Sequence, residues 1–134
     1  MTHLNNWIFN FMLYSLEYSG TKDTAKYLDD NKLNFSSDVG YFPGGHKSIK
    51  ELIRYISRNY LESVDANKIS KELLVKSGVL YKNKDSLYYS PLEERIIFPV
   101  RNKCDSIYKF KGIVFRENDE RAKEYITKDL NNEK

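Results

Sequence analysis

The stretch RIIFPVR, residues Arg95–Arg101, is a continuous apolar run with an arginine at each end. A short apolar run bounded by charge is typical of a buried strand. Pro99 has no backbone N–H to donate, so we expect it at a bulge, a strand end or a sheet edge. After a turn at 102–105, SIYKFKGIVF (residues 106–115) predicts the next strand, kinked near Gly112. Together the two stretches predict the centre of a small antiparallel sheet.

Two shorter stretches precede this pair, at residues 79–81 and 86–89. They are separated by the turn-forming residues Asn83, Lys84 and Asp85, and this spacing predicts a β-hairpin. The change of period occurs after Gly78, because before that residue the apolar positions recur at helical spacing.

Four helices are predicted before Gly78 and one after the sheet. The first four cover residues 4–18, a segment capped by Thr21 and centred on 24–28, a segment opening at Ser48, and 65–76. Between the second and third, residues 34–45 predict a short helical turn followed by a Gly/Pro-rich loop. A final helix is expected over 120–130.

The fold class that follows is α+β: N-terminal helices, then a small antiparallel sheet, then a C-terminal helix. At 134 residues the chain suits one domain. We expect a helical part over about 1–78, a sheet part over about 79–116 and the last helix over about 120–130.

Charge is distributed unevenly along the chain. Residues 47–116 hold fifteen Lys and Arg against eight Asp and Glu, a balance of +7, whereas the segments before and after are slightly acidic. A basic middle with acidic ends is the pattern expected of a surface that follows phosphates, although soluble proteins without a nucleic-acid partner share it. The eleven tyrosines suit both a core and a base-stacking surface.

The residues that carry most enzymatic chemistry are absent from the sequence. One cysteine, Cys104, excludes an internal disulfide and a thiolate zinc site, and the two histidines lie far apart without a nucleophile motif. There is no Walker A loop. Neighbouring carboxylates such as Glu93 and Glu94 diverge on a strand, so they do not predict a pair of Mg²⁺ ions. We therefore expect no catalysis by this chain alone, and no membrane span or signal peptide, which predicts a cytoplasmic protein.

Several local strings, in order, resemble the N-terminal subdomain of the catalytic core of bacterial and phage DnaG-type DNA primases. The strand RIIFPVR is the most specific, and Phe110-x-Gly112 follows where the family has a glycine-rich strand ending in arginine. The other similar strings are AKYL (25–28), FSSDVGYFP (35–43) and LLVKSGVL (73–80). Here the glycine-rich strand reads KFKGI, with Ile113 in place of the arginine, and the family's lysine-tyrosine-leucine-asparagine motif is echoed only by EYIT (124–127).

The resemblance implies a part of a DNA primase that holds single-stranded template DNA in replication. A separate or missing Toprim domain would supply Mg²⁺ and the chemistry, so no cofactor is expected in this chain. The residues expected to contact nucleic acid lie on the predicted sheet: Arg95, Arg101, Lys103, Tyr108, Lys109, Lys111 and Arg116.

The alternative hypothesis is a protein-interaction module or decoy. In that case the chain would bind a Toprim-domain chain, a replicative helicase or another primase, and an exposed apolar patch is expected. The sequence is equally compatible with a natural short protein and with a segment of a longer primase.

Overall fold

The computed structural model describes residues 2–34, 38–59 and 65–128. Its helices are α1 (Thr2–Ser19), α2 (Lys22–Asp30), α3 (His46–Asn59) and α4 (Ala66–Ser77). Its strands are β1 (Gly40–Phe42), β2 (Tyr81–Lys82), β3 (Tyr88–Tyr89), β4 (Arg95–Arg101), β5 (Ile107–Ile113) and β6 (Glu124–Ile126). The predicted α+β class is confirmed, and so are the four N-terminal helices within a few residues.

The main sheet is antiparallel, with strand order β1-β4-β5-β6, and β2 pairs with β3 in a separate hairpin. Strand β4 has the bounds predicted from RIIFPVR. Pro99 lies beyond the last residue of β4 that pairs with β1, so one side of the strand is unpaired there, and a register irregularity follows between Val100 and Arg101. The expectation of an edge or bulge position for Pro99 is confirmed.

Strand β1 was not predicted, because its residues lie in the segment 34–45 that was expected to be a turn and a loop. Gly40 pairs with Ile97 and Phe42 with Arg95. A Cβ added at Gly40 would lie 2.8 Å from the Cβ of Met12 on α1, so only glycine lets the strand approach the helix this closely. Tertiary pairing with β4 therefore overrides a local sequence that is typical of a loop.

The predicted C-terminal helix is wrong over the described residues. Residues 124–126 form β6, which pairs with β5 so that Lys111 lies opposite Ile126. The next residue continues this attachment, because the backbone N–H of Phe110 donates to the Thr127 hydroxyl over 2.8 Å. The Lys128 N–H also donates to the Ser77 carbonyl at the end of α4. Hydrogen bonds to β5 and α4 thus hold this segment extended, although its charges and spacing indicate a helix.

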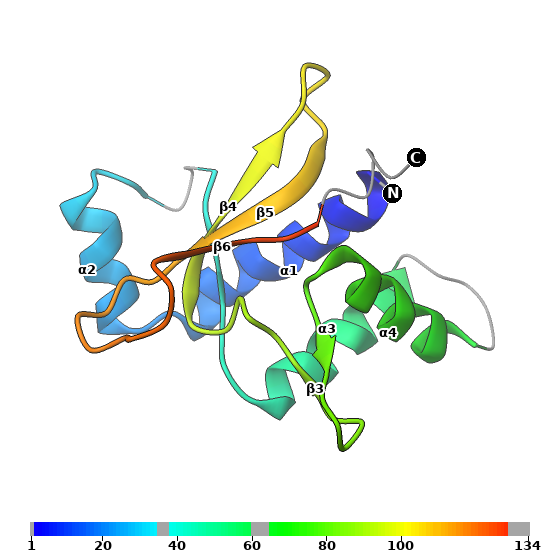
Figure 1. Ribbon diagram of the computed structural model, residues 1–134. Helices are drawn as coiled ribbons and strands as arrows, with labels where there is room; N and C mark the ends of the chain where they lie inside the picture. The colour runs from blue at the N-terminus through cyan, green and yellow to red at the C-terminus, as the bar shows by residue number, and fades with distance from the viewer. Residues whose placement is uncertain (1, 35–37, 60–64, 129–134) are drawn as a thin grey trace.

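The main core lies between α1 and one face of the sheet, with α3 and α4 packed beside it (Figure 1). Phe9 of α1 and Phe110 of β5 stack across this core with ring centroids 6.2 Å apart. A second, smaller cluster covers one end of the opposite face, where Leu28 of α2 meets Tyr41 and Ile96. Helix α1 is therefore the central support of the domain.

Candidate nucleic-acid interface

Arg95 is buried, with 3% of its surface exposed. Its guanidinium donates to the carbonyls of Pro91 (2.8 Å), Gly112 (3.2 Å) and Ala122 (3.0 Å). Burial lowers the pKa of Arg95, and the positive charge of Arg121 adds to this effect. Arg95 thus joins β4, β5 and the segment leading into β6. A phosphate has no access to it in this structure.

Gly112 makes room for the side chain of Arg95. A Cβ at this position would lie 2.9 Å from both Arg95 Cδ and Leu92 Cδ2. The glycine predicted as a kink is therefore a site of close packing, and it also supplies one of the carbonyls that Arg95 binds.

Arg101 and Arg116 are partly exposed, but both are held by carboxylates. The Arg101 guanidinium binds Asp38 through two hydrogen bonds of 2.9 Å each, and this contact raises the pKa of Arg101 further above its usual value. Arg116 binds Asp23 (3.0 Å) and Glu94 (2.8 Å), with its guanidinium 4.6 Å from the centre of the Phe115 ring. The positive charge of both arginines is thus largely balanced within the fold.

Lys109 and Lys111 face away from α1, because Phe110 between them points toward it and neighbours along a strand alternate. Lys109 lies opposite Val100, and Lys111 lies between Phe98 and Ile126 on the adjacent strands. We call this set of five residues the open sheet face. Its four residues on β4 and β5 are half-buried, and Ile126 on β6 is exposed.

The ion pairs of the open sheet face are sparse. Lys111 lies 3.5 Å from Glu124, and the Lys109 ammonium lies 5.4 Å from the centre of the neighbouring Tyr108 ring. Tyr108 is half-buried at the register irregularity, and Lys103 is exposed in the turn between β4 and β5. Seven residues were predicted from the sequence to contact nucleic acid. Four of them are accessible and not held by a short ion pair: Lys103, Tyr108, Lys109 and Lys111.

Two groups of residues were missed by the sequence-based prediction. Arg121 binds Asp119 and also donates to the Glu93 carbonyl over 2.6 Å, so it fastens the segment before β6 to the start of β4. The other group consists of cations on α3 and α4, which hold seven Lys and Arg against two Glu. The charge count of residues 47–116 contained the signal for this second group, because nearly half of its basic residues belong to these two helices.

Two of the described carboxylates that lie next to another acidic residue in the sequence are held by arginines. Glu94 binds Arg116, and Asp119 binds Arg121, whose hydrogen bond lowers the pKa of Asp119 to about 2. Over the three described ranges, no three His, Cys, Asp or Glu side chains gather as they would around a metal ion.

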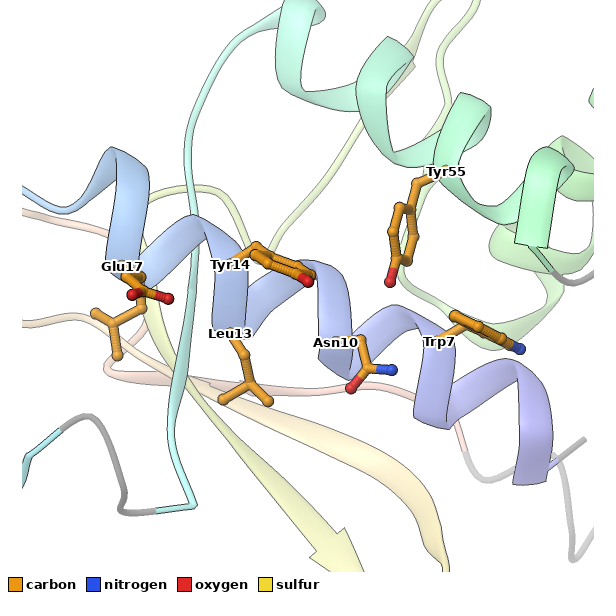
Figure 2. A pocket seen from close by; sticks show the side chains of 7 residues that line it. Trp7, Asn10, Leu13, Tyr14, Glu17 and Tyr55 are labelled. Atoms are coloured by element: carbon orange, nitrogen blue, oxygen red, sulfur yellow. The ribbon is translucent and has the colours of Figure 1, made fainter.

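An aromatic hollow of about 440 Å³ lies between α1 and α3 (Figure 2). Figure 2 shows Tyr55 of α3 pointing toward α1, above Trp7 and Tyr14. The Trp7 and Tyr55 rings meet edge to face at 5.9 Å, and Tyr14 stacks on Tyr18 at 6.0 Å. Tyr14 is 56% and Tyr18 75% exposed, so this surface presents large aromatic side chains to solvent.

A sequence model of the DNA primase catalytic core, N-terminal domain, matches residues 11–131. The chain belongs to this family. The resemblance found in RIIFPVR and the accompanying strings is thereby confirmed. In this primase-core domain the echo of the lysine-tyrosine-leucine-asparagine motif lies on β6, beside Lys111.

Solved primases share the fold of the whole domain. The E. coli primase catalytic core superimposes with a TM-score of 0.74 at 21% identity, covering 95% of this chain and 38% of that one. The RNA polymerase domain of Mycobacterium tuberculosis primase DnaG, solved with a double-stranded DNA carrying a six-nucleotide overhang, gives 0.72 at 16% identity, with coverages of 95% and 37%. A DnaG primase catalytic domain bound to ssDNA gives 0.62 at 21%, with coverages of 96% and 41%.

The chain thus spans well under half the length of these primases. Comparison with curated protein sequences finds no match. In the part of the primase-core domain that the structure describes, no helix is long and apolar enough to cross a membrane.

Proposed function

We propose that the domain holds single-stranded template DNA for a primase during DNA replication, while a Toprim domain supplies Mg²⁺ and the chemistry. The observation that carries this proposal is the open sheet face, where Lys109 and Lys111 lie side by side on one strand with Tyr108 next to them. Solved relatives that hold single-stranded or double-stranded DNA give independent support.

The chemistry of this face suits a nucleic-acid backbone. Two lysines on one side of a strand lie about 7 Å apart, since each residue adds about 3.4 Å to an antiparallel strand. Lys103 extends the positive charge into the turn, and the Tyr108 ring provides a surface on which a base can stack. Arg101 and Arg116 frame this region but are neutralised by their carboxylate partners, and Arg95 acts inside the fold.

Binding of the domain to a fluorescent single-stranded oligonucleotide, measured by anisotropy at low salt, tests the proposal. The variant K109A/K111A is expected to weaken binding and to reduce the slope of log affinity against log salt by about 1.4, because each phosphate that is no longer neutralised accounts for about 0.7. The matched control K22A/K26A removes two lysines from α2 and should change the slope little. Equal behaviour of the two variants would contradict the proposal.

The aromatic hollow favours a second function, docking of a protein partner. Exposed aromatic side chains gathered on one surface are typical of interfaces. The partner we propose is a Toprim-domain chain. The variant Y14A/Y18A should weaken binding to a Toprim segment of a related primase in a calorimetric titration, and its DNA affinity should be unchanged. A Toprim segment that does not bind the unmodified domain would exclude this function.

A further inference from the structure

A second basic surface lies on the helical part of the domain, away from the open sheet face. It centres on a hollow of about 230 Å³ between α3 and α4, lined by Lys50, Ile53, Arg54, Asn67 and Lys71. Figure 1 shows α3 and α4 side by side, well separated from the turn between β4 and β5. Three cations, one amide and an apolar floor therefore meet in one concave site.

Within the described part of the chain, the cations of this hollow have no carboxylate partner of the kind that holds the sheet arginines Arg101 and Arg116. Among the described residues, no ion pair involves Lys50, Arg54 or Lys71. The acidic residues of the two helices are Glu51 and Glu72, and neither lines the hollow. Like charges held together repel one another, so a bound anion would relieve this repulsion.

Lys71 contacts an aromatic ring of the neighbouring hairpin. Its ammonium lies 5.7 Å from the centre of the Tyr88 ring on β3, and the ammonium of Lys82 on β2 lies 5.9 Å from the same centre. Attraction to the ring face favours this position of both cations, which reduces the entropy that Lys71 would lose on binding a ligand. The β2–β3 hairpin thus extends the positive surface beyond the two helices.

The basic residues of α3 form a row along the helix. Lys47, Lys50, Arg54 and Arg58 follow one another at intervals of three and four residues, which places them along one side of the helix. At about 1.5 Å per residue this line is about 16 Å long. A small anion would use only part of it, whereas a phosphodiester backbone carries a charge at each nucleotide and matches its length.

We propose that the surface formed by Lys47, Lys50, Arg54, Arg58 and Lys71 is a second binding site for the phosphates of a nucleic-acid strand, independent of base sequence. The nature of the ligand rests on the proposed function, but the site is separate from the open sheet face. A strand long enough to reach both surfaces would bind both at once, and its affinity would exceed that of a shorter strand.

The variant K50A/R54A/K71A tests the site in the full chain, with anisotropy measured on single-stranded oligonucleotides of increasing length and on a duplex with a single-stranded overhang. Weaker binding is expected, with the salt slope on single strands reduced by about 2, or about 0.7 for each of three phosphates. The gain in affinity with strand length should also disappear. The variant K50R/R54K/K71R keeps the charges and should retain most of the affinity. Helical circular dichroism identifies any variant that fails to fold.

The outcomes separate the two surfaces. If K50A/R54A/K71A keeps the affinity, salt slope and length dependence of the unmodified chain on both DNAs, the second site does not exist, whatever K109A/K111A does. If K109A/K111A binds DNA like the unmodified chain and K50A/R54A/K71A binds more weakly, the open sheet face is excluded as a binding site and the site on α3 and α4 is supported. If K50A/R54A/K71A loses binding to the Toprim segment while its DNA binding is intact, the surface binds protein and the proposal is also overturned.

Discussion

The sheet end and the α3–α4 end of the domain carry similar numbers of basic residues but use them differently. Arg95 and Arg121 bind backbone carbonyls, and Arg101 and Arg116 bind carboxylates, so the sheet end uses all four of its arginines in its own structure. Lys50, Arg54 and Lys71 line a hollow without an ion pair among the described residues. A count of basic residues along the chain therefore overstates the binding capacity of the sheet relative to that of the helices.

Geometry accounts for this difference. A planar guanidinium presents several donors and can satisfy carbonyls on different strands at once, which makes arginine suitable for joining irregular segments. The stretches 90–95 and 116–123 contain few regular hydrogen-bonded residues, and arginines supply the missing links there. Helices α3 and α4 satisfy most of their own backbone groups, so Lys50, Arg54 and Lys71 are not needed for that purpose and can bind a ligand.

The largest expected effect comes from Arg95→Ala. Removing the guanidinium leaves the carbonyls of Gly112 and Ala122 without their donor, so we expect a loss of about 3 kcal/mol in the free energy of unfolding. Arg95→Lys should lose nearly as much, because one ammonium cannot reach carbonyls on three segments. Urea denaturation measures both. If Arg95→Ala were as stable as the exposed control Lys103→Ala, Arg95 would not be a structural residue, and the difference proposed between the sheet and the helices would not hold.

Gly112→Ala tests the packing around the Arg95 side chain by adding a methyl group next to it. The added methyl group would lie 2.9 Å from Arg95 Cδ and Leu92 Cδ2, and overpacking of this kind costs about 1–3 kcal/mol. Gly44→Ala is the matched control, because its Cβ would meet only the flexible side chain of Glu94. Thermal unfolding of the two variants should therefore differ by several degrees, and equal midpoints would show that Arg95 can shift freely.

The sequence predicted most of the elements whose pattern is local. Strand β4 is a continuous apolar run, and α4 ends just before Gly78, whose φ of 84° places it in the left-handed region that favours glycine. Strands β1 and β6 were missed because their structure depends on pairing with β4 and β5. The bonding state of each arginine was equally hidden, since Arg101 and Asp38 are far apart in the sequence.

The difference between the two ends can also be tested by removing a carboxylate that binds an arginine at the sheet end. Asp38→Asn removes the carboxylate that binds Arg101 through two hydrogen bonds, which would leave the guanidinium attached only to Asp105 and able to turn toward a phosphate. We expect tighter binding to single-stranded DNA and a salt slope steeper by about 0.7. Asp29→Asn removes one negative charge from an exposed position of α2 that has no ion pair among the described residues, and controls for net charge. Equal gains from the two variants would mean that overall charge, not pairing, sets the affinity.

The smallest effect concerns Asp119, whose pKa is held at about 2 by its hydrogen bonds with Arg121. Because the folded-state pKa lies below the unfolded value, the ion pair stabilises the fold above about pH 4. This contribution is lost as the pH falls from about 4 through about 2, and for an ion pair near the surface it amounts to no more than about 1 kcal/mol. Asp119→Asn should flatten the acid side of the curve of unfolding free energy against pH, whereas Asp30→Asn, at an exposed position of α2, should leave that curve unchanged. Identical profiles for both variants would show that Arg121 fastens the segment before β6 through the Glu93 carbonyl alone.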